Sequence, residues 1–281
     1  MTGKGLTILN AQMKKILFVL AATLLWTTAD AQDHALFQKF RFIQNGDTLP
    51  YRLLLPEHYD PQKKYPLVLF LHGRGESGSD NEAQLLHGAA IFLKEENRKQ
   101  FPAIVVFPQN AAKYYWSNVQ TVADSSGKRS FYFIAGGEPS PSMQLVMALM
   151  RNLDRQYKIK KDQVYVMGLS MGGMGTFEIV NRMPHTFAAA IPICGGADPG
   201  IAGNLKNTAW WVFHGGKDEV VSPEYSRKMV RAMKANGVPV QFTVYPGAGH
   251  NSWDAAFAEP GLLGWLFAHK RKNNFSKTSN N

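Results

Sequence analysis

The sequence contains very little cysteine. Cys194 is the single cysteine among 281 residues, so the chain can form neither an intrachain disulfide nor a cysteine-based zinc cluster. Internal repeats and low-complexity stretches are also missing, while 45% of the residues are hydrophobic and 12% aromatic. That composition excludes disordered, collagen-like and coiled-coil chains. We expect a single packed domain over residues 32–281.

The first residues have the order of a secretory signal peptide. Residues 13–15 are Met-Lys-Lys, residues 16–26 are apolar but too few to span a bilayer, and residues 29–31 are Ala-Asp-Ala. This order predicts an upstream extension, a signal peptide over about 13–31 cleaved after Ala31, and a secreted or periplasmic protein. A buried N-terminal helix is the alternative. The cleavage site has no cysteine, so we expect no stable membrane anchor.

The formal net charge is +10, and part of the excess lies near the C-terminus. Lys270, Arg271, Lys272 and Lys277 belong to a basic tail that ends in polar residues. A basic balance suits nucleic acid, an acidic polymer or a membrane surface, but an exported protein rarely meets nucleic acid. The pattern favours a solvated tail, and we expect no nucleic-acid partner.

Short apolar runs alternate with helical patterns along most of the chain. Residues 45–47, Asn-Gly-Asp, predict the turn of an antiparallel hairpin. The predicted strands are 37–44, 48–55, 66–71, 103–107, 164–167, 188–193, 210–213 and 240–245. The predicted helices are roughly 81–98, 142–157, 171–183, 222–236 and 254–269. The alternation indicates the α/β class: a mostly parallel central sheet with helices on both faces and an N-terminal antiparallel hairpin.

Residues 110–141 interrupt this alternation, because they are rich in Gly, Ser and aromatic residues and lack clean periodicity. Loops of this length in compact domains are usually functional or disordered. This one follows the strand predicted at 103–107, so it leaves the sheet at the carboxyl edge, where α/β proteins bind ligands. We expect it to form part of a substrate wall.

Residues 168–173, Gly-Leu-Ser-Met-Gly-Gly, contain the pattern Gly-x-Ser-x-Gly between a predicted strand and a predicted helix. A turn this tight requires glycine two residues before and two after the serine. It exposes the Ser170 hydroxyl at a helix N-terminus, where free N–H groups favour developing negative charge. Ser170 is therefore the candidate nucleophile.

A serine hydroxyl needs a base and an acid that orients the base. Asp218 and His250 follow two predicted strands in the chain order Ser, acid, His, and both lie just past strand ends. Glu219 adjoins Asp218, and spacing alone does not separate the two. We expect His214 to be a strand-end histidine whose hydrogen bonds are satisfied, rather than the base. The weaker alternatives are Asp198, Asp254, His87 and His185.

Residues 72–78, His-Gly-Arg-Gly-Glu-Ser-Gly, directly follow the strand predicted at 66–71. Acyl transfer places negative charge on the carbonyl oxygen, and two backbone N–H groups must already point at it. The candidate donors are the N–H groups of Met171 and Arg74. His72 is then expected to hold the loop by hydrogen bonds.

Five segments together resemble the α/β-hydrolase superfamily, and within it the phospholipase/carboxylesterase and dienelactone-hydrolase-like esterases. Some secreted bacterial members of that group are labelled predicted peptidases or prolyl-oligopeptidase-like. The segments are Leu71-His-Gly-Arg-Gly-Glu-Ser-Gly78, Gly168-Leu-Ser-Met-Gly-Gly173, Ile191-Pro-Ile-Cys-Gly-Gly196, Phe213-His-Gly-Gly-Lys-Asp218 and Tyr245-Pro-Gly-Ala-Gly-His-Asn-Ser-Trp253. The resemblance covers about 60–270. It implies Ser170 as nucleophile, Asp218 as acid and His250 as base, with no metal or organic cofactor.

Dienelactone hydrolases proper use a cysteine nucleophile, so Ser170 argues against that activity. We expect a secreted serine hydrolase that cleaves small-molecule or polysaccharide-linked carboxylic esters through an acyl-enzyme. Trp116 and Trp253 are candidate substrate-binding residues, although each could equally pack its own loop. A serine peptidase of the prolyl-oligopeptidase-like type and a non-catalytic carbohydrate-binding protein are the alternatives. Cys194 is expected in the core.

Overall fold

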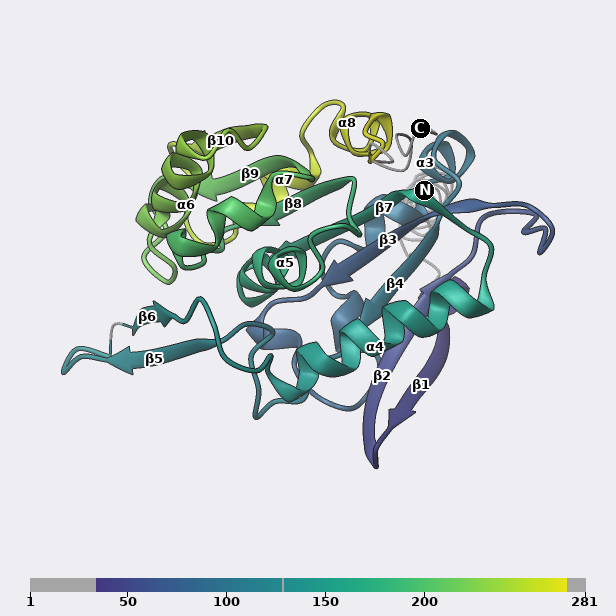
Figure 1. The fold of residues 1–281 in the computed structure, drawn as a ribbon, viewed down its shortest axis with the longest axis horizontal. Coiled ribbons are helices and arrows are strands. Elements are labelled where there is room, and N and C mark those ends of the chain that lie inside the picture. The colour runs from purple at the N-terminus through teal and green to yellow at the C-terminus, as the bar shows by residue number, and fades with distance from the viewer. Residues whose placement is uncertain (1–33, 128, 272–281) are drawn as a thin grey trace, which may run out of the picture. The chain divides into compact units, whose positions relative to one another are not determined.

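A computed structural model of the protein describes residues 34–127 and 129–271 (Figure 1). The predicted signal peptide, its cleavage after Ala31 and the tail beyond Arg271 lie outside the described residues, and they stay predictions. Within the described part of the chain, none of the helices is long and apolar enough to cross a membrane.

An eight-stranded sheet organises the described residues, in the order β1-β2-β4-β3-β7-β8-β9-β10. The six strands from β4 to β10 in that order run parallel, and β1 and β2 join antiparallel at one edge. This confirms the predicted fold class and its N-terminal hairpin. The bounds are β1 Gln38–Gln44, β2 Asp47–Leu54, β3 Tyr65–Leu71, β4 Ile104–Pro108, β7 Ile159–Leu169, β8 Ala189–Ile193, β9 Ala209–Gly215 and β10 Val240–Tyr245.

The hairpin turn between β1 and β2 follows from two residues. Asn45 and Gly46 both have positive φ, 53° and 83°, which Asn and Gly tolerate best. They join Gln44 to its partner Asp47 in a two-residue loop. That backbone geometry matches the twist of the paired strands, as the Asn-Gly signal predicts.

The sheet is covered on both faces, because successive residues of its inner strands enter different cores. In β3, Leu67, Leu69 and Leu71 belong to one apolar cluster, and Val68 and Phe70 to the other. The first cluster includes residues of α4 (Pro141–Gln156), α5 (Met171–Arg182) and α6 (Pro223–Ala235). The second includes residues of α2 (Ala89–Leu93), α7 (Trp253–Phe257) and α8 (Leu262–Ala268).

Two predicted helices are wrong in extent. Over 81–98 the chain forms η3 (Ala83–Leu85), α2 and α3 (Glu95–Gln100), because Gly88 takes a φ of +83° against the ring of Phe70. Over 254–269 it forms α7 and α8, separated where Pro260 is followed by Gly261 with a φ of +78°. A left-handed residue ends the helical geometry, and proline supplies no N–H donor.

The long segment 110–141 holds a hairpin that sequence periodicity missed. Its strands are β5 (Val119–Ala123) and β6 (Arg129–Phe133), which form a separate two-stranded sheet. Figure 1 shows this hairpin reaching out from the β-sheet beneath α5 and α6. The middle of β6 contacts α6, because the Phe131 N–H donates to the Tyr225 hydroxyl at 2.9 Å.

The strand order places a crevice at the carboxyl end of the sheet. From β3 the chain moves to its neighbour β4 on one side, and later returns as β7 on the other. The connections therefore diverge between β3 and β7, the point where open α/β sheets bind ligands. The loop after β3 carries Gly73 and Arg74, and the turn after β7 carries Ser170.

Candidate active site

Ser170 occupies a strained turn between β7 and α5. Its φ and ψ are 53° and −117°, a conformation that non-glycine residues rarely adopt. The flanking glycines are required sterically. A Cβ on Gly172 would lie 1.8 Å from the Leu71 carbonyl oxygen, and a Cβ on Gly168 would lie 2.3 Å from that of Gly172. This turn places the serine side chain at the crevice.

Ser170, His250 and Asp218 form a continuous hydrogen-bonded chain. The Ser170 Oγ lies 2.9 Å from His250 Nε2, and His250 Nδ1 lies 2.8 Å from Asp218 Oδ2. Asp218 follows β9 and His250 follows β10, so adjacent parallel strands deliver both residues to the same edge of the sheet. Because Nδ1 faces a carboxylate, it carries the proton, and Nε2 is free to accept from the serine.

The Asp218 carboxylate is buried and fully hydrogen-bonded. Oδ1 accepts from the backbone N–H groups of Val220 and Val221, both at 2.9 Å, and Oδ2 faces His250. Burial alone would raise the pKa of Asp218, but hydrogen bonds from His214, His250 and the Val221 N–H outweigh it and hold the pKa well below its usual range. The carboxylate is therefore ionised throughout the physiological pH range.

The loop after β3 lies against the nucleophile turn. A Cβ on Gly73 would lie 3.6 Å from the Ser170 Cβ. Arg74 is the first residue of the short helix η2 (Arg74–Glu76), and Met171 is the first residue of α5. First-turn N–H groups have no acceptor inside their own helix, so these two are available for an anionic oxygen beside Ser170.

His72 supports that loop from within the protein. Its Nδ1–H donates to the Gly73 carbonyl at 2.6 Å, and its Nε2 accepts from the Asn110 N–H at 2.9 Å. These contacts match the expectation that His72 holds the loop. Burial lowers the pKa of His72 to about 4, against the smaller opposing effect of the Gly73 carbonyl. The ring is therefore neutral and contributes no second base.

The other acidic and histidine candidates lie apart from the His250 ring. Glu219 is exposed, whereas Asp218 is 5% exposed and contacts His250. Asp198 caps the helix η4 (Pro199–Leu205), where it accepts from the Gly200 N–H. Asp254 lies in α7, and His185 contacts Asn207. His87 packs on Trp253, with ring centroids 5.1 Å apart.

A cavity of about 290 Å³ opens over Ser170 and His250. One wall comes from the loop after β3, and another from the 110–141 segment. Its lining residues include Tyr115, Arg129, Phe131, Met174, Val221 and Trp253. Phe131, Met174 and Val221 form a separate small apolar cluster, so the hairpin contributes an apolar surface beside the nucleophile.

The two tryptophans predicted to bind substrate have different positions. Trp253 lines the cavity, and its ring lies edge-on to His250 at 5.4 Å. Trp116 is fully buried, and its Nε1–H donates to the His72 carbonyl at 3.0 Å. Trp116 therefore packs its own loop beneath the site, and the structure does not place it in the cavity wall.

Three contributors to the site escaped the sequence analysis. His214 is the satisfied strand-end histidine that was expected, with partners at Ser226 and Val221, but its contact with the acid was not foreseen: its Nε2 lies 3.2 Å from Asp218 Oδ2. Tyr115 and Phe131 line the cavity from the long loop. The alternation of Ser130, Phe131, Tyr132 and Phe133 after a Gly-containing turn was a strand signal that could have revealed the hairpin.

Cys194 directly follows β8 beside the site. The donor atoms of Cys194, Asp218 and His250 lie within 4.8 Å of one another, which is the spacing of a possible metal site. Burial and the Asp218 charge raise the pKa of the Cys194 thiol well above its usual range. Metals bind the thiolate, and Asp218 and His250 already bond each other, so this group is poorly suited to hold an ion.

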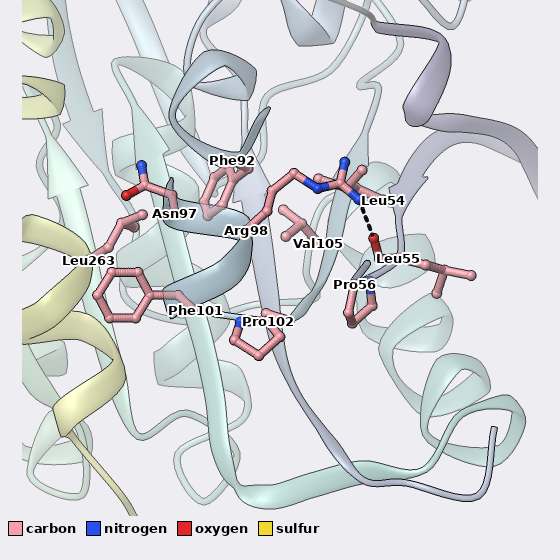
Figure 2. A pocket seen from close by; sticks show the side chains of 11 residues that line it. Leu54, Leu55, Pro56, Phe92, Asn97, Arg98, Phe101, Pro102, Val105 and Leu263 are labelled. Carbon is pink, nitrogen blue, oxygen red and sulfur yellow. Dashed lines mark hydrogen bonds between the residues drawn. The ribbon is translucent and has the colours of Figure 1, made fainter. Parts of the chain in front are cut away.

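Figure 2 shows a different pocket, at the opposite edge of the sheet. It lies where β2 ends and β4 begins, and Arg98 there donates to the Leu55 carbonyl at 3.4 Å. Its lining residues include no histidine, cysteine, serine or carboxylate. It lacks the groups that nucleophilic catalysis needs.

Similarity to known proteins agrees with this architecture. A thermostable esterase of known crystal structure superposes with a TM-score of 0.75 at 33% identity, covering 84% of this chain and 64% of that chain. The chain has the α/β-hydrolase fold. Residues 138–261 match the model of the dienelactone hydrolase family, and they include Ser170, Asp218 and His250.

Two curated relatives are also esterases by name. A probable feruloyl esterase C of Aspergillus terreus is 26% identical over 179 residues, which cover 64% of this chain and 58% of that protein. A probable carboxylesterase of Arabidopsis thaliana is 26% identical over 195 residues, or 66% of this chain and 72% of that protein. The chain thus spans less than two thirds of the length of the feruloyl esterase and of the thermostable esterase. The expected resemblance to hydrolases of this fold is confirmed.

Proposed function

We propose that the protein is a serine esterase that cleaves carboxylic esters through an acyl-enzyme at Ser170. The observation that carries the proposal is the hydrogen-bonded chain from Ser170 Oγ through His250 to Asp218, with distances of 2.9 and 2.8 Å. Relatives named esterases and carboxylesterases support it.

In the first half of the reaction, Ser170 Oγ attacks the ester carbonyl carbon while its proton passes to His250 Nε2. The Met171 and Arg74 N–H groups stabilise the oxyanion, and Asp218 stabilises the imidazolium. The tetrahedral intermediate then collapses. His250 returns the proton to the alkoxide, so the alcohol leaves and the acyl group stays on Ser170.

In the second half, a water molecule takes the place of the alcohol. His250 Nε2 accepts its proton while its oxygen attacks the acyl carbon, and the same two N–H groups stabilise the second oxyanion. Collapse expels Ser170 Oγ, which regains the proton from His250. The products are a carboxylic acid, an alcohol and the original enzyme.

We further propose aromatic acyl esters, including feruloyl groups on polysaccharides, as the substrate class, and export through the N-terminal segment. The cavity supports an aromatic acyl group because Phe131, Met174 and Trp253 line it beside Ser170. Relatives named feruloyl esterases point to the same class. N-terminal sequencing of protein recovered from the exporting cell tests cleavage after Ala31.

The decisive experiment is hydrolysis of matched aryl esters by the purified protein and by Ser170→Ala. Acetyl, butyryl and feruloyl esters of one chromogenic alcohol, together with the corresponding anilides, separate acyl preference from peptidase activity. We expect ester turnover that falls by several orders of magnitude in Ser170→Ala at unchanged thermal stability. Full activity in a folded Ser170→Ala protein contradicts the proposal, and faster anilide than ester cleavage favours a peptidase.

A further inference from the structure

A second histidine lies behind the acid of the proposed triad. His214 is in β9, is fully buried and does not reach the cavity. Its Nδ1 lies 2.8 Å from the Ser226 Oγ, and its Nε2 lies 2.8 Å from the Val221 carbonyl oxygen. The same Nε2 lies 3.2 Å from Asp218 Oδ2, the oxygen that also faces His250.

The partners of His214 determine which of its nitrogens carries a proton. Nε2 faces a carbonyl oxygen and a carboxylate oxygen, and both only accept, so Nε2 must be protonated. The Ser226 hydroxyl lies within 2.9 Å of the Gly195 carbonyl as well as beside Nδ1. If the His214 ring is neutral, the Ser226 hydroxyl donates to its Nδ1. If the ring is cationic, its Nδ1–H donates to the Ser226 oxygen, and the hydroxyl donates to the Gly195 carbonyl. In both states the Nε2–H is shared between the Val221 carbonyl at 2.8 Å and Asp218 Oδ2 at 3.2 Å.

His214 completes the set of donors around the Asp218 carboxylate. Oδ1 has the two backbone N–H groups of Val220 and Val221, and Oδ2 has His250 Nδ1 and His214 Nε2. The bond from Nε2 to the Val221 carbonyl also fixes the turn that supplies those backbone donors. One buried ring thus supports the acid directly and through its loop.

We propose that His214 is a positioning residue of this site: its Nε2–H shares the charge of Asp218 and thereby sets how strongly Asp218 stabilises protonated His250. The proposal rests on the esterase function proposed above. A carboxylate that accepts a bond from His214 stabilises the His250 imidazolium less. Loss of that donor therefore makes His250 more basic. A cationic His214 would act in the opposite direction, because it would draw more of the Asp218 charge away from His250.

The titratable groups around Asp218 and His214 come from several elements. His250 faces Asp218 from the loop after β10, and Cys194 approaches from the end of β8. Burial keeps the Cys194 thiol protonated, since it raises the pKa of that group far above the working range. Changes in the acid limb of the pH profile therefore report on His250 and its connection to His214.

The test compares His214→Gln with His214→Asn in the full chain. The glutamine amide nitrogen can take the place of Nε2 and still donate to Asp218, whereas the shorter asparagine can reach only the Nδ1 side. The measurement is the rate of Ser170 labelling by a fluorophosphonate probe between pH 5 and 9. The probe reads the reactivity of the nucleophile without an ester substrate. Thermal unfolding verifies that each variant is folded.

We expect the acid limb of His214→Asn to move to higher pH by about 0.5–1 unit, and that of His214→Gln to stay near the wild type. A folded His214→Asn protein that loses rate equally at every pH, without moving the limb, overturns the proposal and leaves His214 a packing role. If the wild type itself is not labelled, the proposed function fails and the inference fails with it.

A measurement on the wild type covers the case in which the variants do not fold. In ¹⁵N-histidine-labelled protein, the ring of His214 is expected to keep a protonated Nε2 between pH 5 and 9, coupled to a slowly exchanging hydrogen. An unprotonated Nε2 would overturn the proposal, because the ring could not then donate to Asp218.

Discussion

Replacing Asp218 by asparagine should disable His250 without removing any atom contact. Oδ1 accepts from two backbone N–H groups, so the amide oxygen must take that position. The amide NH₂ then occupies the place of Oδ2, facing His250 Nδ1 and His214 Nε2. Because an NH₂ group donates and does not accept, it favours the His250 tautomer with its proton on Nε2. That tautomer points a hydrogen at Ser170 and has no lone pair for the serine proton.

Asp218→Asn should lower both kcat and the free energy of unfolding, and the two losses can be measured separately. With the wrong tautomer, kcat should fall by roughly 10⁴-fold, as for the equivalent change in serine proteases. His214 Nε2–H keeps the Val221 carbonyl as an acceptor, so the loss in unfolding free energy should be about 1–3 kcal/mol from one poorly paired buried donor. The two effects are measured by steady-state hydrolysis of an aryl ester and by denaturant unfolding.

Glu219→Gln is the matched control, since it makes the same chemical change one residue away on an exposed side chain. It should leave kcat within about twofold and stability within about 0.5 kcal/mol of the wild type. An Asp218→Asn protein with turnover within tenfold of the wild type would refute the assignment of the acid. If Glu219→Gln were the inactive variant, the neighbouring carboxylate would be the acid.

Three further perturbations test other parts of the structure. His72 has a pKa lowered to about 4 by burial, so the unfolded state binds the proton more tightly and stability should fall with pH from about 6.5 to 4, by up to about 3 kcal/mol. His72→Gln should flatten that decline in pH-dependent urea unfolding, and an unchanged slope would mean that other groups cause it. Phe131→Ala should raise the KM for feruloyl esters by about tenfold, because an apolar contact in the cavity is lost. Tyr132 lies on the same strand and is 58% exposed, so Tyr132→Ala should leave the KM unchanged. Equal effects of the two substitutions would exclude Phe131 from the acyl site. Gly172→Ala should abolish activity and cost several kcal/mol, because its Cβ would lie 1.8 Å from a backbone oxygen, whereas Gly264→Ala has open space and should be tolerated. A stable, active Gly172→Ala protein would contradict the steric requirement for glycine in this turn.

Features controlled by neighbouring residues were readable from the sequence. The strands of the parallel sheet are short apolar runs because both of their faces are buried. The β1–β2 turn depends on two adjacent residues that tolerate positive φ. The turn at Ser170 depends on glycines two positions away on either side. Sterics over a few residues determine each of these features, so no knowledge of the rest of the chain is required.

The ends of the helices and the β5–β6 hairpin were harder to predict from the sequence. Gly88 breaks the predicted 81–98 helix because the chain there packs against Phe70, a residue on a different strand. The β5–β6 hairpin contains alternating aromatic residues, but its apolar side is completed by Met174 and Val221 from distant parts of the chain. A short amphipathic strand gains its stability from such contacts, and local periodicity does not contain them.

By itself, the sequence determined the fold class, the serine turn and the chain order of a serine, an acid and a histidine. The tertiary structure decided which groups meet. Ser170 and His250 are 80 residues apart, and Asp218 and His250 are 32 apart, yet the sheet order brings their side chains to one edge. It placed Asp218 rather than Glu219 against His250, put His214 behind the carboxylate and buried Trp116. These outcomes depend on which strands are neighbours and on which direction each side chain leaves its turn, and long-range packing alone sets both.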